Sequence, residues 1–187
     1  MYKSMQFALL GITALFGLHY SRASKQYLDQ NPALQEYQDE ASIFPLEETW
    51  YLAYRNFELD PVFGGDAKCV RFKSSGPGAD GAYPVVSQYA PNFSADATVS
   101  PSLSPDYTIE NVLNFKTQGQ AASVQGISAY TDVKKCAVFR MPYAGEGKCA
   151  LLVPESKLNS IDTCCNFIFD LLCGNTLRFN ISDSTCE

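Results

Sequence analysis

Eight short segments rich in aromatic and β-branched residues follow one another between residues 49 and 153. They are Thr49–Phe57, Lys68–Lys73, Tyr83–Tyr89, Asp96–Ser100, Tyr107–Lys116, Ala122–Tyr130, Cys136–Met141 and Cys149–Val153. Turn-forming sequences such as Gly64-Gly65 and Gly76-Pro77-Gly78 separate them. Short strands at this spacing are typical of an all-β meander. Eight strands close a small antiparallel up-and-down β-barrel with room for one ligand, which is the fold we expect.

A different pattern follows the last of these segments. Between Leu158 and Cys173 apolar residues recur at helical spacing, and Gly174 stands where a helix C-cap belongs. One amphipathic segment after eight strands predicts a C-terminal α-helix packed on the outside of the barrel. The polar lead-in from Ser24 to Leu46 is expected to hold a short helix over Ala33–Glu40.

The N-terminus has the pattern of a secretory signal peptide. A basic residue, Lys3, precedes the apolar run Met5–Leu18, which is too short to span a bilayer. Small residues stand before the expected cleavage point, which follows Ala23. We therefore predict a signal peptide over residues 1–23 and a single secreted domain over residues 24–187.

Charge and histidine content exclude several classes of function. The expected mature chain has 12 basic and 20 acidic residues, a net charge of −8, which is the wrong sign for nucleic acid or an anionic membrane. The only histidine, His19, lies in the expected signal peptide, so imidazole-based nucleophilic catalysis and most catalytic zinc sites are excluded. The adjacent acids Glu47 and Glu48 face opposite ways on a strand, which indicates a solvated pair. We expect no enzymatic activity, cofactor or metal.

The cysteines and sequons fit an exported protein. There are seven cysteines, at positions 69, 136, 149, 164, 165, 173 and 186. In an exported chain this number predicts a disulfide framework with one thiol left over, and no pair has the CxxC spacing of a zinc ribbon. The sequons at Asn92 and Asn180 predict two glycosylated surface positions.

Strand parity gives a first map of the barrel interior. Between Tyr107 and Phe115 the odd positions are mostly apolar and should face inward. A strand cysteine that must reach the outer helix or the tail faces outward, so its neighbours face inward. The inward residues expected to contact a ligand are Val70, Phe72, Ile109, Leu113, Phe139, Met141, Ala150 and Leu152.

Three blocks of sequence resemble a known family. The stretch from Trp50 to Cys69, with its Asp-Pro-Val-Phe-Gly-Gly turn, resembles the first hairpin of tick histamine-binding proteins. Ala129-Tyr130-Thr131-Asp132 followed by Cys136 is similar to the end of the family's sixth strand and the start of its seventh. The family's last strand resembles the stretch Cys149-Ala-Leu-Leu-Val. Its helix resembles the segment from Cys164-Cys165 to Cys173-Gly. The resemblance covers most of residues 48–187 and implies a salivary lipocalin.

The resemblance also implies disulfide pairs. The family joins its second-strand cysteine to the terminal one, here Cys69–Cys186, and its seventh-strand cysteine to the helix, here Cys136–Cys165. We expect Cys149–Cys173 as the third pair. Cys164 is then unpaired, either buried or available to a partner.

The family is known for sequestering histamine and serotonin, and some relatives hold eicosanoids, other lipids or sterols. Its amine binders have a Glu and a Trp on the eighth strand that align with Ala150 and Leu152, and an acid that aligns with Ala137. Only Asp60 survives from that set, with Phe57 and Phe63 as aromatic neighbours. A cationic amine in a dry cavity needs carboxylates. The sequence therefore favours a small, mostly apolar ligand such as a sterol, fatty acid or eicosanoid.

Several alternatives stay open. Arg55 and Asp60 are expected near the mouth as contacts for a ligand hydroxyl or carboxylate; alternatively, Asp60 only caps the Asp-Pro turn and Arg55 pairs with it. An amine could instead be clamped by Asp60 and Glu110. In a third alternative the loops and Cys164 grip a host plasma protein or immune-cell receptor. The turn after the first strand is similar to the japanin-like, lipid-binding branch, which acts on dendritic cells.

Overall fold

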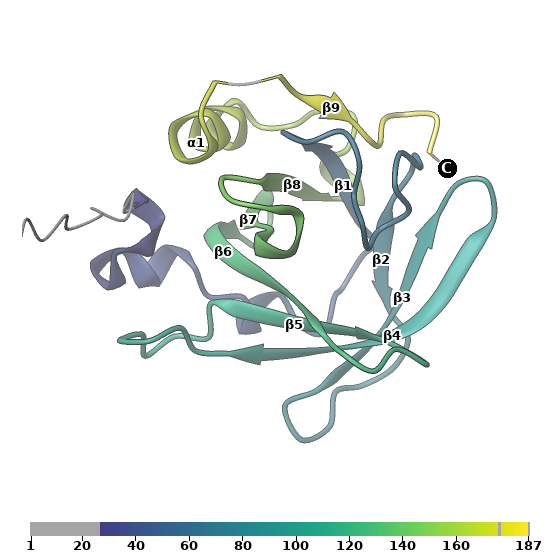
Figure 1. Cartoon of the computed structure of the whole chain (residues 1–187), viewed down its shortest axis with the longest axis horizontal. Coiled ribbons are helices and arrows are strands. Elements are labelled where there is room, and N and C mark those ends of the chain that lie inside the picture. The colour runs from purple at the N-terminus through teal and green to yellow at the C-terminus, as the bar shows by residue number, and fades with distance from the viewer. Residues whose placement is uncertain (1–26, 176, 187) are drawn as a thin grey trace, which may run out of the picture.

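The computed structural model describes residues 27–175 and 177–186 (Figure 1). The predicted signal peptide lies outside these residues. The strands are β1 (Trp50–Arg55), β2 (Arg71–Ser74), β3 (Tyr83–Tyr89), β4 (Phe93–Ser102), β5 (Val112–Thr117), β6 (Val124–Asp132), β7 (Cys136–Arg140), β8 (Cys149–Pro154) and β9 (Phe179–Asn180). No helix within the described ranges is long and apolar enough to cross a membrane.

The first eight strands form a closed antiparallel barrel. The order runs from β2 through β8 to β1, and β1 returns to β2 through Trp50 opposite Phe72 and Tyr51 opposite Arg71. The predicted eight-stranded barrel is confirmed, and the fold is that of a lipocalin. The ninth strand was not predicted, because Phe179 and Asn180 become a strand only by pairing with Arg55 and Tyr54 of β1.

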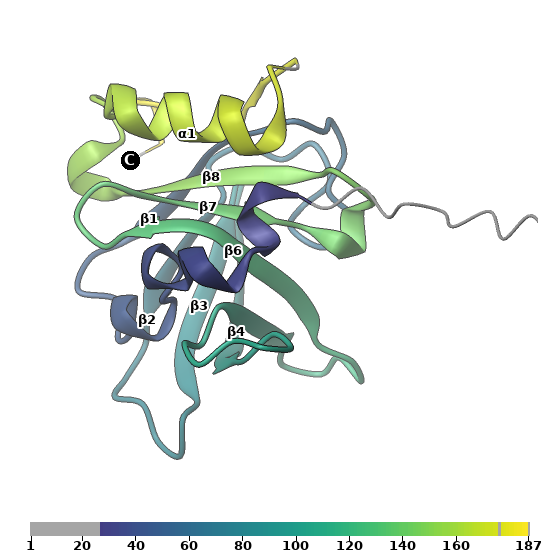
Figure 2. The same cartoon turned by 90° about the vertical axis from the view of Figure 1, so that its left-hand side faces the viewer.

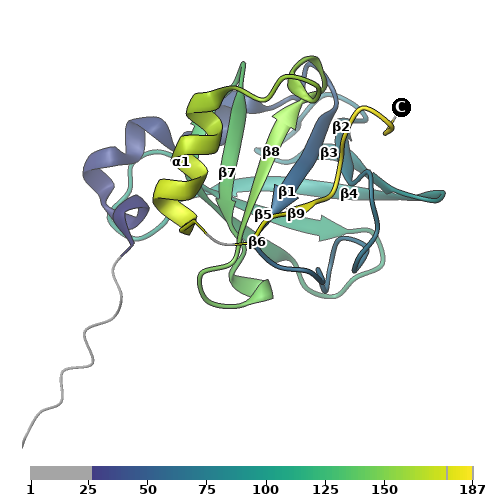
Figure 3. The same ribbon diagram turned by 90° about the horizontal axis from the view of Figure 1, so that it is seen from above.

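The expected helix packs on the outside of the barrel, as predicted. Helix α1 (Thr163–Cys173) lies over β7 and β8 (Figure 3). It begins later than Leu158, since the Asp162 side chain accepts a hydrogen bond from the Cys164 amide and caps it there. Gly174, with a φ of 84°, ends it.

Alternation along the strands separates two apolar cores. On β8, Leu151 and Val153 face outward and pack with Phe169 of α1, whereas Ala150 and Leu152 belong to the core inside the barrel. The disulfides Cys69–Cys186, Cys136–Cys165 and Cys149–Cys173 tie strands β7 and β8 to α1 and the first hairpin to the C-terminus. These are the three pairs expected, and the remaining Cys164 is exposed.

The lead-in segment crosses the outside of β6 before the chain enters β1 (Figure 2). It contains the 3₁₀ turns η1 (Leu28–Gln30), η2 (Pro32–Tyr37) and η3 (Ala41–Ile43) instead of the single helix expected over Ala33–Glu40. The helix prediction failed because tertiary contacts decide the backbone here: buried Gln38 donates hydrogen bonds to the carbonyls of Ser128 and Ala129.

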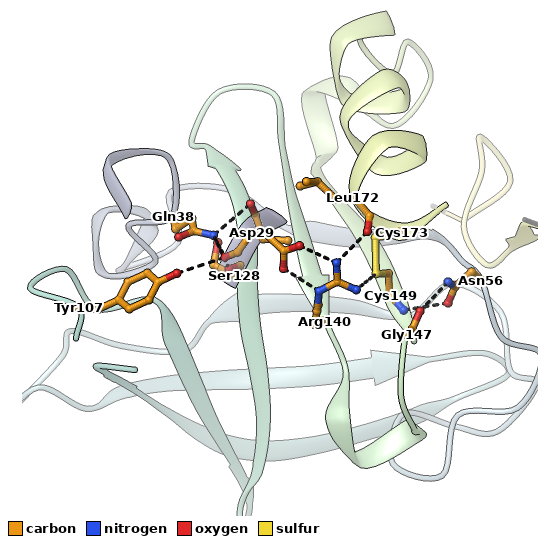
Figure 4. A network of polar contacts seen from close by, with 11 residues as sticks. Asp29, Gln38, Asn56, Tyr107, Ser128, Arg140, Gly147, Cys149, Leu172 and Cys173 are labelled. Atoms are coloured by element: carbon orange, nitrogen blue, oxygen red, sulfur yellow. Dashed lines mark hydrogen bonds and ion pairs between the residues drawn. A yellow bond between two sulfur atoms is a disulfide. The ribbon is translucent and has the colours of Figure 1, made fainter. Parts of the chain in front are cut away.

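A buried polar network fastens this segment (Figure 4). Asp29 accepts hydrogen bonds from Arg140 of β7 at 2.6 and 2.5 Å, and Arg140 also donates to the Leu172 carbonyl of α1. Tyr107 donates from its hydroxyl to the Asp29 carbonyl. The lead-in, the barrel and the outer helix thus meet at one guanidinium group.

Strand β5 begins five residues later than predicted. The Asn111 side chain accepts a hydrogen bond from the Ser104 amide and closes a loop there, while the Glu110 carbonyl accepts one from the Glu40 amide of the lead-in. The inward position predicted for Ile109 is therefore wrong: it lies half-buried in the bend before β5 and outside the apolar core of the barrel.

Candidate ligand cavity

The barrel encloses an apolar cavity. The centre of a water-sized molecule can occupy about 80 Å³ of it, and the figure rises to about 720 Å³ only when all non-atom space, including open solvent at the mouth, is counted. Its lining residues are Ile43, Phe44, Leu46, Trp50, Leu52, Phe63, Phe72, Val85, Val99, Leu113, Phe115, Val124, Gly126, Phe139, Met141, Tyr143 and Leu152. None of them carries a charge, and the only hydrogen-bonding side-chain groups among them are the Trp50 indole and the Tyr143 hydroxyl.

Alternation in all eight barrel strands builds the cavity wall. Inward positions of each strand from β1 to β8 contribute at least one apolar side chain, because side chains alternate across a strand. Phe63, from the turn after β1, packs edge-to-face on Phe72 and Phe115 with ring centroids 5.3 and 4.9 Å apart. These three rings make the interior aromatic as well as apolar.

The lead-in segment supplies another part of the wall. Ile43, Phe44 and Leu46 line the cavity, and Phe44 stacks on Tyr83 of β3 with ring centroids 5.1 Å apart. The Leu46 amide donates a hydrogen bond to the Ser74 hydroxyl of β2 at 2.8 Å. The cavity wall therefore includes residues ahead of the barrel that strand parity did not identify.

Arg55 and Asp60 form a fully buried pair. One nitrogen of the Arg55 guanidinium lies 3.3 Å from the Asp60 carboxylate, and both side chains are 0% exposed. The other guanidinium nitrogens donate to the carbonyls of Phe57, Glu58 and Gly65. Burial lowers the pKa of Arg55, and the Asp60 carboxylate opposes this shift.

Asp60 also caps its own turn. One carboxylate oxygen accepts hydrogen bonds from the amides of Val62 and Phe63, both at 2.9 Å. The other accepts one from the Tyr143 hydroxyl at 3.3 Å, and burial raises the pKa of that hydroxyl, which keeps it protonated. The structure thus has the capped turn and ion pair that were the alternative interpretation, and neither Arg55 nor Asp60 lines the cavity.

A second buried acid lies in the lead-in. Glu40 is 0% exposed and accepts a hydrogen bond from the Thr131 hydroxyl of β6, next to Ser128. Its pKa is raised from 4.5 to about 7, chiefly by burial; the Thr131 and Ser128 hydroxyls lower it, and the neighbouring Asp39 makes a smaller upward contribution. Its second oxygen has no hydrogen-bond partner within the described residues. No sequence pattern identified this residue, because its burial depends on how the lead-in docks.

The predicted contact residues fall into three groups. Six line the cavity: Phe63, Phe72, Leu113, Phe139, Met141 and Leu152. Phe57, Val70 and Ala150 belong to the same inner core without lining the cavity. Arg55 and Asp60 lie behind Tyr143, and Ile109 lies outside. Glu110 is exposed, so the clamp of Asp60 and Glu110 is not assembled.

No cluster of metal-binding side chains occurs within the part of the chain that the structure describes. The surfaces around the two sequons are accessible, since Asn92 and Asn180 are both exposed.

Comparison with known proteins gives a family and a fold. A family model described as tick histamine binding protein matches residues 28–187. A male-specific histamine-binding salivary protein of Rhipicephalus appendiculatus is 24% identical over 184 residues, covering 87% of this chain and 90% of the relative.

Two solved structures share the fold. One is a serotonin complex of AM182, with a TM-score of 0.54, 18% identity, and coverage of 75% of this chain and 85% of that one. The other is japanin from Rhipicephalus appendiculatus bound to cholesterol, with a TM-score of 0.54, 17% identity, and coverage of 74% and 95%.

Proposed function

The chain belongs to the tick histamine-binding protein family, and from this premise we propose that it sequesters a small, mostly apolar host molecule such as a sterol, fatty acid or eicosanoid. The observation that carries the proposal is the cavity wall, which is apolar and uncharged throughout. Burial of apolar ligand surface against such a wall is favourable by about 25 cal/mol per Å². A buried cation without a partner would be opposed by several kcal/mol.

The one acid inherited from the family's amine-binding set supports the same choice. Asp60 already pairs with Arg55, and its oxygens accept hydrogen bonds from two amides and a tyrosine hydroxyl. To bind an amine it would have to give up these partners. A neutral ligand requires no such rearrangement.

The relatives allow both kinds of ligand. One solved relative is named for its serotonin complex and another for bound cholesterol. The cholesterol-bound protein shows that this fold accommodates an apolar guest, and the uncharged wall of the present cavity favours that class here. The cavity also offers no acid, base or nucleophile to a guest, which supports binding without chemical conversion.

Release into saliva is part of the proposal. The curated relative is a salivary protein, and three disulfides are typical of exported chains. We propose that residues 1–23 are removed and that Asn92 and Asn180 carry glycans. N-terminal sequencing of protein secreted by insect cells should begin at Ser24, and treatment with a glycosidase should lower the mass.

The ligand is tested by native mass spectrometry and by titration. Secreted protein should carry a copurified lipid, or bind added sterol, fatty acid or eicosanoid with one-to-one stoichiometry. Leu152→Trp places an indole in the cavity and should abolish binding, whereas Leu152→Met conserves volume and should preserve it. If no lipid copurifies and none of these ligands binds the wild-type protein, the proposal is wrong.

Binding of a biogenic amine is the second candidate, favoured by the names of the histamine and serotonin relatives. Calorimetry with histamine and serotonin decides between the two. Heat of binding that persists after lipid removal would support the amine; no heat and no displacement of lipid would exclude it.

A host protein or receptor as a further partner also stays a proposal. The loop after β4 exposes Leu103, and pull-down from host plasma or labelling of host leukocytes tests this role. Loss of the interaction in Leu103→Glu, but not in an exposed control such as Leu59→Glu, would assign it to this loop.

A further inference from the structure

The outward face of helix α1 carries two large apolar side chains that are exposed. Its exposed residues are Thr163, Cys164, Phe167 and Leu171, and the side chains of Phe167 and Leu171 are 63% and 57% exposed. The helix lies on the surface, with nothing in the described chain over this face (Figure 3). A surface helix normally turns charged and polar residues to solvent, so this face is the reverse of what a monomer requires.

The spacing on this face is that of a helix-pairing seam. Cys164, Phe167 and Leu171 are separated by three and then four residues, as are the a and d positions of a two-stranded coiled coil. The charge beside the seam is neutralised, because Asp170 forms a 2.5 Å ion pair with Arg178. Asp170 therefore adds no net negative charge at the place where two negatively charged molecules would meet.

The Cys164 thiol, at the first position of the seam, indicates which molecule covers this face of α1. All other cysteines of the chain are already in disulfides, and Cys164 is free and exposed. An unpaired cysteine in an exported protein points to an intermolecular bond. A second copy of the chain presents both an apolar helix face and a thiol at the matching position.

We propose that two copies pair through this face, with their α1 helices parallel about a two-fold axis and a disulfide joining Cys164 to Cys164 of the second copy. In a two-fold interface each residue on the axis meets its own equivalent, so Phe167 faces Phe167 and Leu171 faces Leu171. This inference is independent of which ligand the cavity holds.

The size of the face explains why a covalent bond is needed. A stable interface buries about 800 Å² on each partner, and one exposed stripe on a helix of 11 residues is far smaller. The apolar contact therefore aligns the two copies, and the disulfide holds them. Its formation removes two protons and two electrons from the two thiols. A small-molecule disulfide accepts them by thiol–disulfide exchange and leaves as two thiols.

The first experiment measures the mass of the full secreted protein. Light scattering and a non-reducing gel should show a dimer that mild reduction converts to monomer, and Cys164→Ser should be monomeric with unchanged lipid binding. Leu171→Glu, which keeps the thiol, should slow dimer formation from reduced monomer in glutathione disulfide several-fold. Leu59→Glu, an exposed apolar control outside the face, should not.

The second experiment tests the parallel arrangement. In a Cys164→Ser background, Leu171→Cys should crosslink two copies, because parallel helices bring the two 171 positions together. An antiparallel pair centred on position 164 would separate them by about 21 Å, too far for a disulfide. Leu59→Cys in the same background controls for random collision.

The proposal is wrong if the wild-type protein is a monomer whose Cys164 is a free thiol or carries glutathione, or if Cys164→Ser still forms dimers. A crosslink in Leu171→Cys no faster than in the Leu59→Cys control would overturn the parallel arrangement.

Discussion

The buried carboxyl of Glu40 should make the stability of the protein depend on pH in a direction opposite to that of most acids. Its pKa in the folded protein is raised from 4.5 to about 7, chiefly by burial. A group with a raised folded-state pKa stabilises the fold below its unfolded pKa, and that contribution is lost as pH rises through the folded value. Wild-type protein should therefore lose stability from this residue between about pH 4.5 and pH 8.

The magnitude follows from the shift. Each pKa unit corresponds to 1.36 kcal/mol, so a rise from 4.5 to about 7 amounts to about 3 kcal/mol. Glu40→Gln keeps the shape and the capacity to bond the Thr131 hydroxyl but cannot ionise. The variant should gain about 3 kcal/mol relative to wild type between pH 4.5 and pH 8.5.

The assay is urea unfolding with the disulfides intact, at both pH values, for wild type, Glu40→Gln and Glu36→Gln. Other groups also titrate in this range, so the quantity that counts is the difference between variant and wild type. Glu36 lies exposed on the same segment and serves as the control. Parallel stability curves for Glu40→Gln and wild type from pH 4.5 to 8.5 would refute the reasoning.

Three further changes have expected outcomes. Asp29→Ala leaves Arg140 buried without its carboxylate and should lower the free energy of unfolding by about 3 to 5 kcal/mol, measured in urea; a loss below 1 kcal/mol would show that the pair contributes little. Phe169→Ala removes a fully buried ring that packs edge-to-face on Tyr54 and should lower the same quantity by about 3 to 5 kcal/mol, whereas exposed Leu59→Ala should not. Gly126→Leu extends a side chain from a position whose Cβ would already lie 3.3 Å from Phe139; lipid binding should weaken, and unchanged affinity would mean that the ligand does not reach β6.

Much of the barrel could be predicted from the sequence because alternation is a local property. Once Cys136 and Cys149 are assigned outward, Ala137, Phe139 and Leu152 must face inward, and the structure places them there. The same argument identified five of the six predicted residues that line the cavity, whereas Phe63 came from the family resemblance. It needs only the strand boundaries and the direction of one residue on each strand.

The parts of the fold and the cavity that could not be predicted depend on contacts between segments far apart in the sequence. The start of β5 is set by the bond from the Ser104 amide to Asn111, and the 3₁₀ turns of the lead-in by bonds from Gln38 to β6. Neither leaves a periodic pattern in the sequence. The same holds for Ile43, Phe44 and Leu46, which line the cavity only because that segment is held in place.

Asp60 illustrates why a family residue does not carry its role with it. If it turned to a ligand amine, Arg55 would remain fully buried without a carboxylate, a loss of about 3 to 5 kcal/mol. The two amide bonds to Val62 and Phe63 would also be lost, at about 1 kcal/mol or more each. In this chain Asp60 therefore stabilises the turn that places Phe63 in the cavity wall, and it accepts a hydrogen bond from Tyr143, which also lines the cavity.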